Sequence, residues 1–438
     1  MKCHLRVFLF HCFSLCLVCV ALENNTFSQV PQNVRIGLEY TTTGFQPCEP
    51  SIAISQKNPK IVVAGSILDN VYRSKDGGLT WKQNTLESSF GVYGDPCVIS
   101  SPNGDFYYLH LSDPEGQGWS SDMLLDRIVC QHSTNNGKKW SDGGSIGLEH
   151  PKDQDKEWAV ATSDGKMIHA CWTQFDQYDS RSPEDSTIIL CSFSDRKAVA
   201  WSTPVRISEK AGDCLDDDET TEGAVPSVGP NDELYVAWAV NESILFDRSY
   251  DGGKTWLEHD VKAADIVGGW AQTVESIGRV NGMPVTAVDL APDSPHYGRI
   301  YINWTDERHG ENDLDVFVTY SDNNGESWCP PIRVNDDVPG KQQFFTWMAV
   351  DPSNGGIHIV FYDRRNHEDS TTDVYVASSF DGGESFVNQI VSESPFLPKG
   401  EVFFGDYNNI SAVDGHVRPI WTREVDGVLT IMTAILDF

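Results

Sequence analysis

Basic residues are scarce in this chain of 438 residues. Lys and Arg number 32 against 64 Asp and Glu, which gives a formal net charge of −32. A surface of that sign repels phosphate backbones and anionic lipid headgroups, so nucleic acid is not an expected partner. The composition also lacks the periodic glycine of collagen and the biased usage of coiled coils and disordered chains. The class of protein that these exclusions leave is a large globular one.

Long hydrophobic runs are missing except at residues 7–20, which follow two basic residues and end at the small residue Ala21. This is typical of a secretory signal, because a membrane anchor needs about 18 or more uninterrupted apolar residues. We therefore expect a signal peptide over residues 1–21 and a secreted, soluble mature chain over 22–438 that does not insert into a membrane. Four N-glycosylation sequons agree with this route, at Asn24, Asn241, Asn303 and Asn409.

Metal-ligand spacings are also absent. Of 11 cysteines, seven follow the expected signal peptide, and none lies in a CxxC or Cys/His pattern, so we reject a zinc site. Secretion favours disulfides, and Cys171 with Cys191, on neighbouring expected strands, is the preferred pair. The acidic loop at residues 213–219 could hold Ca²⁺, but it lacks the EF-hand spacing, and a solvated charged loop is the alternative. No other cofactor is expected.

One motif, Ser-x-Asp-Gly-Gly-x-Thr-Trp, recurs along the whole chain. Its copies start at Ser74, Ser133, Ser249, Ser321 and Ser379, with a degenerate copy at Ser192. Successive starts are 59, 59, 57, 72 and 58 residues apart. In such a turn, Asp or Asn accepts hydrogen bonds from backbone amides, Gly supplies a positive φ, and the closing aromatic ring packs on its neighbour. The motif therefore marks a repeated structural unit rather than a site.

These turns resemble the Asp-box (BNR) repeats of sialidases and related β-propellers, and the similarity covers essentially the whole mature chain. In that family the box joins the third and fourth strands of a blade, at the edge away from the ligand. Short aromatic and β-branched runs between Gly, Asp and Asn turns independently favour an all-β fold. The resemblance therefore implies an all-β Asp-box propeller.

The number of blades follows from the expected first strands, which lie at 50–55, 96–100, 158–162, 224–228, 284–289, 346–351 and 409–414. They predict a seven-bladed propeller in one domain over 22–438. Six blades are the alternative, because the third and seventh units lack a good box. The last unit has only three strands, so we expect residues 34–40 to pair beside 429–436 and close the ring.

Acidic residues recur where these first strands begin, at Glu49, Asp95, Glu157, Glu222 and Asp406. First strands begin, and second strands end, at the same face of a propeller, so these side chains should converge on the mouth of the central channel. Crowded carboxylates raise one another's pKa, which suits general acid/base chemistry or a divalent cation. The alternative for each acid is a hydrogen bond from a turn amide.

Second-strand ends supply arginines from three consecutive blades, at Arg308, Arg364, Arg365 and Arg423. Guanidinium groups bind carboxylates bidentately, and in sialidases an arginine triad clamps the carboxylate of the sugar. The resemblance therefore implies these four as substrate-binding residues, with Asp95, Glu157, Glu222, Asp406 and Tyr407 as catalytic candidates. The alternative for the arginines is salt bridging to acids next to them in sequence. Trp158 is either a platform for a sugar face or a core residue.

The resemblance predicts a secreted, glycan-directed, sialidase-like glycoside hydrolase that acts on a glycan or polysaccharide at an acidic channel mouth. The sequence departs from sialidases in two ways. The N-terminal Phe/Tyr-Arg-Ile-Pro segment has no clear match beyond residues 34–37, and sialidases have six blades. A non-catalytic lectin or interaction propeller, or a polysaccharide lyase, are the alternatives.

Overall fold

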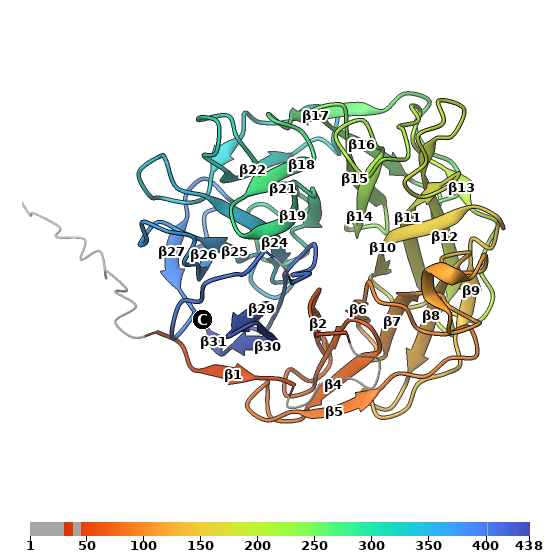
Figure 1. Ribbon diagram of the computed structural model, residues 1–438, viewed down its shortest axis with the longest axis horizontal. Coiled ribbons are helices and arrows are strands. Elements are labelled where there is room, and N and C mark those ends of the chain that lie inside the picture. The colour runs from red at the N-terminus through yellow and green to blue at the C-terminus, as the bar shows by residue number, and fades with distance from the viewer. Residues whose placement is uncertain (1–29, 38–44, 401) are drawn as a thin grey trace, which may run out of the picture.

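The computed structural model describes residues 30–37, 45–400 and 402–438, and within them seven antiparallel sheets surround a central axis (Figure 1). The expected signal peptide, its cleavage site and Asn24 lie outside the described residues. The seven-bladed β-propeller is confirmed, and the six-bladed alternative is wrong. No helix in the described part of the chain is long and apolar enough to cross a membrane.

The first four blades each consist of four consecutive strands. Blade 1 contains β2 (Ser51–Ile54), β3 (Val62–Ser66), β4 (Asn70–Ser74) and β5 (Lys82–Thr85). Blade 2 contains β6 (Cys97–Ser100), β7 (Phe106–Leu111), β8 (Ile128–Ser133) and β9 (Gly144–Ile146). Blade 3 contains β10 (Asp153–Ala161), β11 (Met167–Phe175), β12 (Thr187–Asp195) and β13 (Val205–Arg206). Blade 4 contains β14 (Glu222–Val228), β15 (Leu234–Val240), β16 (Ser243–Ser249) and β17 (Val261–Asp265).

The remaining blades include one insertion and one closure. Blade 5 contains β20 (Val285–Val288), β21 (Ile300–Asp306), β22 (Asp315–Ser321) and β23 (Ile332–Arg333). Blade 6 contains β24 (Gln343–Val350), β25 (Ile357–Asp363), β26 (Asp373–Ser379) and β27 (Val387–Ile390). Blade 7 contains β28 (Asn409–Val413), β29 (His416–Val425), β30 (Val428–Ala434) and β1 (Asn33–Arg35), with β31 (Leu436–Asp437) paired to β29. Outside the blades lie the hairpin β18 (Ala271–Val274) and β19 (Ile277–Asn281) and the 3-10 helix η1 (Gly118–Ser120).

Blade 7 joins the two ends of the described chain. β1 pairs antiparallel with β30, and Val34 lies opposite Thr433. Residues 38–40 of the strand expected at 34–40 lie outside the described residues. The N-terminal strand thus takes the place of a fourth strand, and this edge of the sheet is paired rather than exposed.

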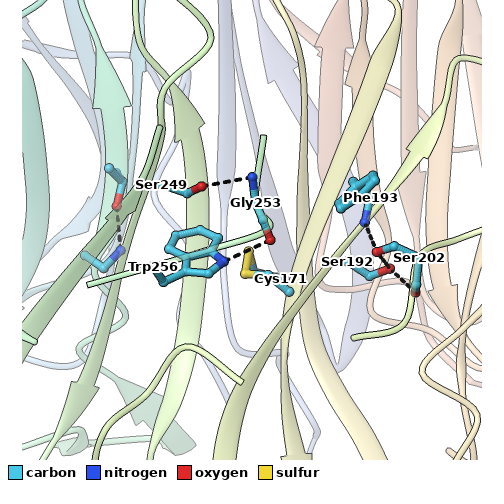
Figure 2. The surroundings of a disulfide bond; sticks show 10 residues. Cys171, Ser192, Phe193, Ser202, Ser249, Gly253 and Trp256 are labelled. Carbon is cyan, nitrogen blue, oxygen red and sulfur yellow. Dashed lines mark hydrogen bonds between the residues drawn. A yellow bond between two sulfur atoms is a disulfide. The ribbon is translucent and has the colours of Figure 1, made fainter. Parts of the chain in front are cut away.

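The Asp-box of blade 4 shows how the repeated turn is held (Figure 2). Ser249 Oγ donates to Asp251 Oδ1 at 2.9 Å, and the Gly253 amide donates back to Ser249 Oγ at 2.9 Å. Thr255 Oγ1 donates to Asp251 Oδ2 at 2.7 Å, and the Trp256 indole donates to the Gly253 carbonyl at 3.1 Å. Hydrogen bonds from the Thr255 amide and hydroxyl lower the pKa of Asp251 to about 2. This carboxylate is a structural acceptor.

The boxes also connect neighbouring blades. At four boundaries an arginine of one blade donates to a backbone carbonyl in the box of the next: Arg73 to Asn136, Arg248 to Asn324, Arg299 to Gly382 and Arg418 to Gly77. Strand register places these contacts away from the first-strand starts. In blade 1, Ile54 at the end of the first strand pairs with Val62, which pairs with Ser74 of the box. Boxes and first-strand starts therefore occupy opposite ends of the propeller.

Cys171 and Cys191 face each other on β11 and β12 and form the predicted disulfide, with their Cα atoms 4.2 Å apart. Trp256 of the blade 4 box lies beside this bond (Figure 2). Two of the predicted sequons are not available for glycosylation, because the side chains of Asn303 and Asn409 are buried. Asn241 is exposed in the turn between β15 and β16.

Candidate functional site at the channel mouth

The backbone is distorted where first strands enter the ring. A residue with positive φ lies at this point in six blades: Glu49, Asp95, Lys156, Gly223, Phe345 and Gly405. In blades 3, 4 and 6 the pairing of the first two strands shifts its register here, as in a β-bulge. Bulges re-aim the neighbouring side chains, and a positive φ is costly for residues other than glycine. Positive φ thus recurs where first strands enter the mouth, and it redirects the neighbouring side chains there.

The structure brings together the acidic side chains that the sequence placed at first-strand starts. Glu49, Glu157, Glu222 and Asp406 are buried, and Asp95 is partly buried beside them. Burial, followed by the charge of neighbouring carboxylates, raises the pKa of Asp95, Glu157 and Glu222 well above the usual range. The surroundings of these three acids therefore favour the protonated form.

Glu49 and Asp95 form a carboxyl pair. Burial raises the pKa of both groups, and the charge of Glu49 raises the pKa of Asp95 further. Burial, and next the charge of Asp406, raise the pKa of Glu49 to about 7. Glu49 is thus partly protonated at a pH where an isolated carboxyl group would have lost its proton.

Two cations hold Asp406 in the opposite state. Lys156 Nζ donates to Asp406 Oδ2 at 2.9 Å, and Arg279 Nε donates to Asp406 Oδ1 at 2.8 Å. Although burial acts in the other direction, Arg279 and Lys156 lower the pKa of Asp406 to about 2. Arg279 Nη1 also donates to Asp216 Oδ2 at 2.5 Å and to the Tyr178 hydroxyl at 3.2 Å. Asp406 is therefore ionised at neutral pH, and it forms an ionised anchor that fixes the side chains of Lys156 and Arg279.

Sequence reasoning did not find Arg279, Lys156, Asp155 or Asp216. Arg279 lies in the β18–β19 hairpin, which occupies the one box-to-box interval of 72 residues where the others are 57 to 59. That longer interval was the available signal for an inserted element. Lys156 and Asp155 were visible only as a charged segment before a first strand, and the bulge in β10 turns them into the site.

A cavity of about 540 Å³ opens above these charges. Its wall contains the polar residues Glu49, Asp95, Asp155, Lys156 and Arg279. It also contains six aromatic residues, Phe45, Tyr93, Trp119, Tyr178, Phe403 and Phe404. Trp119, in η1, is 66% exposed and its ring centroid lies 5.6 Å from that of Tyr178. Apolar ring faces beside polar groups are the ordinary composition of a ligand site.

Trp158, Trp347 and Tyr407 form an aromatic plug in the channel. The ring centroid of Trp158 lies 4.2 Å from that of Trp347 and 5.1 Å from that of Tyr407. All three are buried, and none is in the wall of the mouth cavity. Trp158, considered as a sugar platform, instead packs in this plug, and Tyr407, considered as a catalytic residue, lies beside it. Trp119 is the exposed indole at the cavity.

The four arginines expected to bind substrate make other contacts. Arg308 pairs with Asp306, and its guanidinium carbon lies 4.4 Å from the ring centroid of Phe317. Arg365 pairs with Asp363 at 2.7 Å. The two remaining side chains donate to neutral partners, Arg364 to Gln342 Oε1 at 2.9 Å and Arg423 to Ser394 Oγ at 2.6 Å. None belongs to the cavity wall, so the structure does not bring them to the acids.

The acidic loop at 213–219 uses its carboxylates internally. Asp213 Oδ1 accepts from Thr220 Oγ1 at 2.8 Å, while Asp216 accepts from Arg279 and Tyr178. Within the described ranges no three His, Cys, Asp or Glu side chains are arranged to hold a metal ion. The loop therefore contributes an anchor for Arg279.

Comparison with known proteins gives distant likenesses. No protein-family model matches the chain. The xyloglucanase Xgh74A of Acetivibrio thermocellus is 23% identical over 419 residues, which are 90% of this chain and 40% of the xyloglucanase. This chain thus spans about two fifths of the length of that relative.

Among solved structures, the Hadza microbial sialidase Hz136 is similar with a TM-score of 0.49 and 13% identity, over 87% of this chain and 75% of the sialidase. The Trypanosoma rangeli sialidase is similar with a TM-score of 0.48 and 11% identity, over 93% of this chain and 60% of the sialidase. The structural neighbours thus include sialidases, while the seven blades are established by the strands of this chain itself.

Proposed function

We propose that this protein is a secreted glycoside hydrolase that cleaves a glycan in the mouth cavity. The observation that carries the proposal is the Glu49–Asp95 carboxyl pair, which holds a proton near neutral pH and lies in the wall of an aromatic-lined cavity. Glycoside hydrolases use two carboxyl groups, one of which must be protonated to release the leaving group. The distant xyloglucanase likeness agrees with this class of reaction.

The Glu49–Asp95 pair supplies the general acid. Asp95, whose pKa is raised well above its usual range, donates its proton to the glycosidic oxygen, and the neighbouring charge of Glu49 favours the protonated form of Asp95 before that step. Asp155 is the second carboxylate in the wall, and it acts on the sugar as base or nucleophile. Its Oδ1 accepts from the Lys156 amide at 2.9 Å, and its Oδ2 lies 3.9 Å from the Lys156 ammonium, so its orientation is fixed.

The aromatic wall accounts for binding. Trp119 presents an indole that is 66% exposed, and sugar rings stack on such faces through their C–H groups. A lyase would need a cation free to neutralise a uronate, whereas both cations of the wall are ion-paired to Asp406. The site therefore supports hydrolysis better than elimination.

The test combines a glycan array with a panel of chromogenic glycosides, using the full chain from a secreting host. We expect turnover, and a loss of about 10²- to 10⁴-fold in kcat for Asp95→Asn and Glu49→Gln. Asp322→Asn is the matched control, because it removes a carboxylate from an arginine pair outside the cavity. Binding without turnover would favour a lectin, and unchanged turnover in both variants would remove the pair from the mechanism.

A further inference from the structure

Arg279 is the more exposed cation of the mouth cavity, and its guanidinium makes four hydrogen bonds to the protein from its five N–H groups. Nε and Nη2 donate to the two oxygens of Asp406, and Nη1 donates to Asp216 and to the Tyr178 hydroxyl. Every nitrogen of the group thus has a protein acceptor. No edge of the guanidinium keeps two free N–H groups, so a sugar carboxylate could be bound bidentately only by displacing an acceptor that is already in place.

Lys156 is paired with the same carboxylate. Its ammonium donates to Asp406, and both side chains are buried. These are the two Lys or Arg residues that the described part of the chain contributes to the cavity wall. Three carboxyl groups, of Glu49, Asp95 and Asp155, lie in the same wall. An anionic ligand would therefore lose its hydration beside these acids without gaining an unpaired cation, and a charge that is desolvated without a partner is unfavourable.

We propose that Arg279, held by Asp216 and Asp406, sets the charge preference of the cavity, so that it binds uncharged sugars and rejects carboxylated ones. The proposal rests on the proposed function only in taking the ligand to be a glycan. The sequence predicts the opposite preference, because four other arginines imply a site that binds the carboxylate of an acidic sugar. Arg279 acts here as a specificity-determining residue, delivered by a hairpin that is extra to the seven blades.

The test uses pairs of oligosaccharides that end either in a hexose or in the corresponding hexuronic acid, together with sialylated oligosaccharides. Equilibrium binding to the full chain is followed by tryptophan fluorescence or calorimetry. We expect the uncharged member of each pair to bind at least about tenfold more tightly. Asp216→Asn frees one edge of Arg279 and should reduce this ratio by about threefold to tenfold. Asp322→Asn, which makes the same charge change on Arg299, should leave it unchanged.

Equal or tighter binding of the carboxylated sugars by the wild-type chain would overturn the proposal, as would a ratio that Asp216→Asn does not alter in a folded variant. The wild-type comparison decides the question even where that variant fails to fold. Hydrolysis is scored separately. Uncharged sugars that are bound but not cleaved would overturn the hydrolase and support the charge preference, whereas no binding of either class would overturn both.

Discussion

Carboxyl groups at the two ends of this propeller have opposite properties. At the box end, Asp76 and Asp251 accept hydrogen bonds from turn amides and hydroxyl groups, and their pKa values are lowered. At the mouth, Asp95 and Glu222 are desolvated among other carboxyl groups, and their pKa values are raised. Carboxyl groups thus favour the ionised form in the box turns and the protonated form at the mouth.

The backbone shows the same division. In the boxes, positive φ values fall on glycines such as Gly253, at +82°, and on Asn136 and Asn324, which are residue types that adopt this region readily. At the mouth they fall on Glu49 at +53°, Asp95 at +46° and Lys156 at +53°, where a side chain is present. Strain of this kind persists when the surrounding structure imposes it, and it is commonly found at functional sites. The two ends of the propeller therefore differ in the residue types that adopt positive φ.

The largest expected effect comes from breaking the ionised anchor at the mouth. Asp406→Asn removes the carboxylate that Lys156 and Arg279 share, and it leaves a buried ammonium without its closest counter-charge. We expect a loss of about 3 to 5 kcal/mol in the free energy of unfolding, measured by urea denaturation. Asp322→Asn instead removes a carboxylate that is 60% exposed, and its partner Arg299 keeps a hydrogen bond to the Gly382 carbonyl, so the loss should be at most about 1 kcal/mol. Equal losses in the two variants would show that burial of the anchor is unimportant.

The next effect is a pH dependence that distinguishes the two ends. Glu49 has a pKa of about 7 in the folded chain against 4.5 for an unperturbed Glu, so the folded state binds more protons between these values. Stability therefore falls as pH rises from 4.5 to 7, by about 1 to 3 kcal/mol for this group. Asp76 acts oppositely, because its lowered pKa makes its contribution disappear as pH falls below 4.

Denaturation midpoints measured from pH 3 to 8 check this sign. Glu49→Gln cannot titrate at this position and should flatten the decline between pH 4.5 and 7, while the loss of stability in strong acid remains. If the stability of the wild-type chain rose between pH 4.5 and 7, the raised pKa of Glu49 in the folded state would be contradicted.

The sequence predicts the box end more completely than the mouth. Box turns depend on residues within eight positions of one another, as in Ser249 to Trp256, so their chemistry can be recognised locally. The blade number follows from the seven expected first strands, and the Cys171–Cys191 bond follows from the place of both cysteines on neighbouring expected strands. The convergence of acids from different blades also follows, since every first strand starts at the same end.

The contents of the mouth cavity depend on tertiary geometry. The position of Arg279 depends on where an inserted hairpin folds back, and Lys156 is aimed by a bulge that its neighbours in sequence do not specify. Trp158 and Tyr407 lie at first-strand starts, as the acids do, yet they turn into the channel because their rings pack against Trp347. The direction of a side chain, rather than its position along the strand, therefore decides whether a residue lines the mouth cavity or packs in the aromatic plug.

The smallest expected change in stability tests whether the two ends act independently. Asp76→Ala removes the acceptor of bonds from the Thr80 amide at 2.9 Å and the Thr80 hydroxyl at 2.6 Å. We expect a loss of about 1 to 2 kcal/mol in the free energy of unfolding, with glycan binding unchanged. Trp119→Ala is the converse variant, because this indole is 66% exposed. It should alter stability by less than about 0.5 kcal/mol and weaken glycan binding by about tenfold. If Asp76→Ala weakened binding as much as Trp119→Ala, the mouth geometry would depend on the box turns, and the division between the two ends would fail.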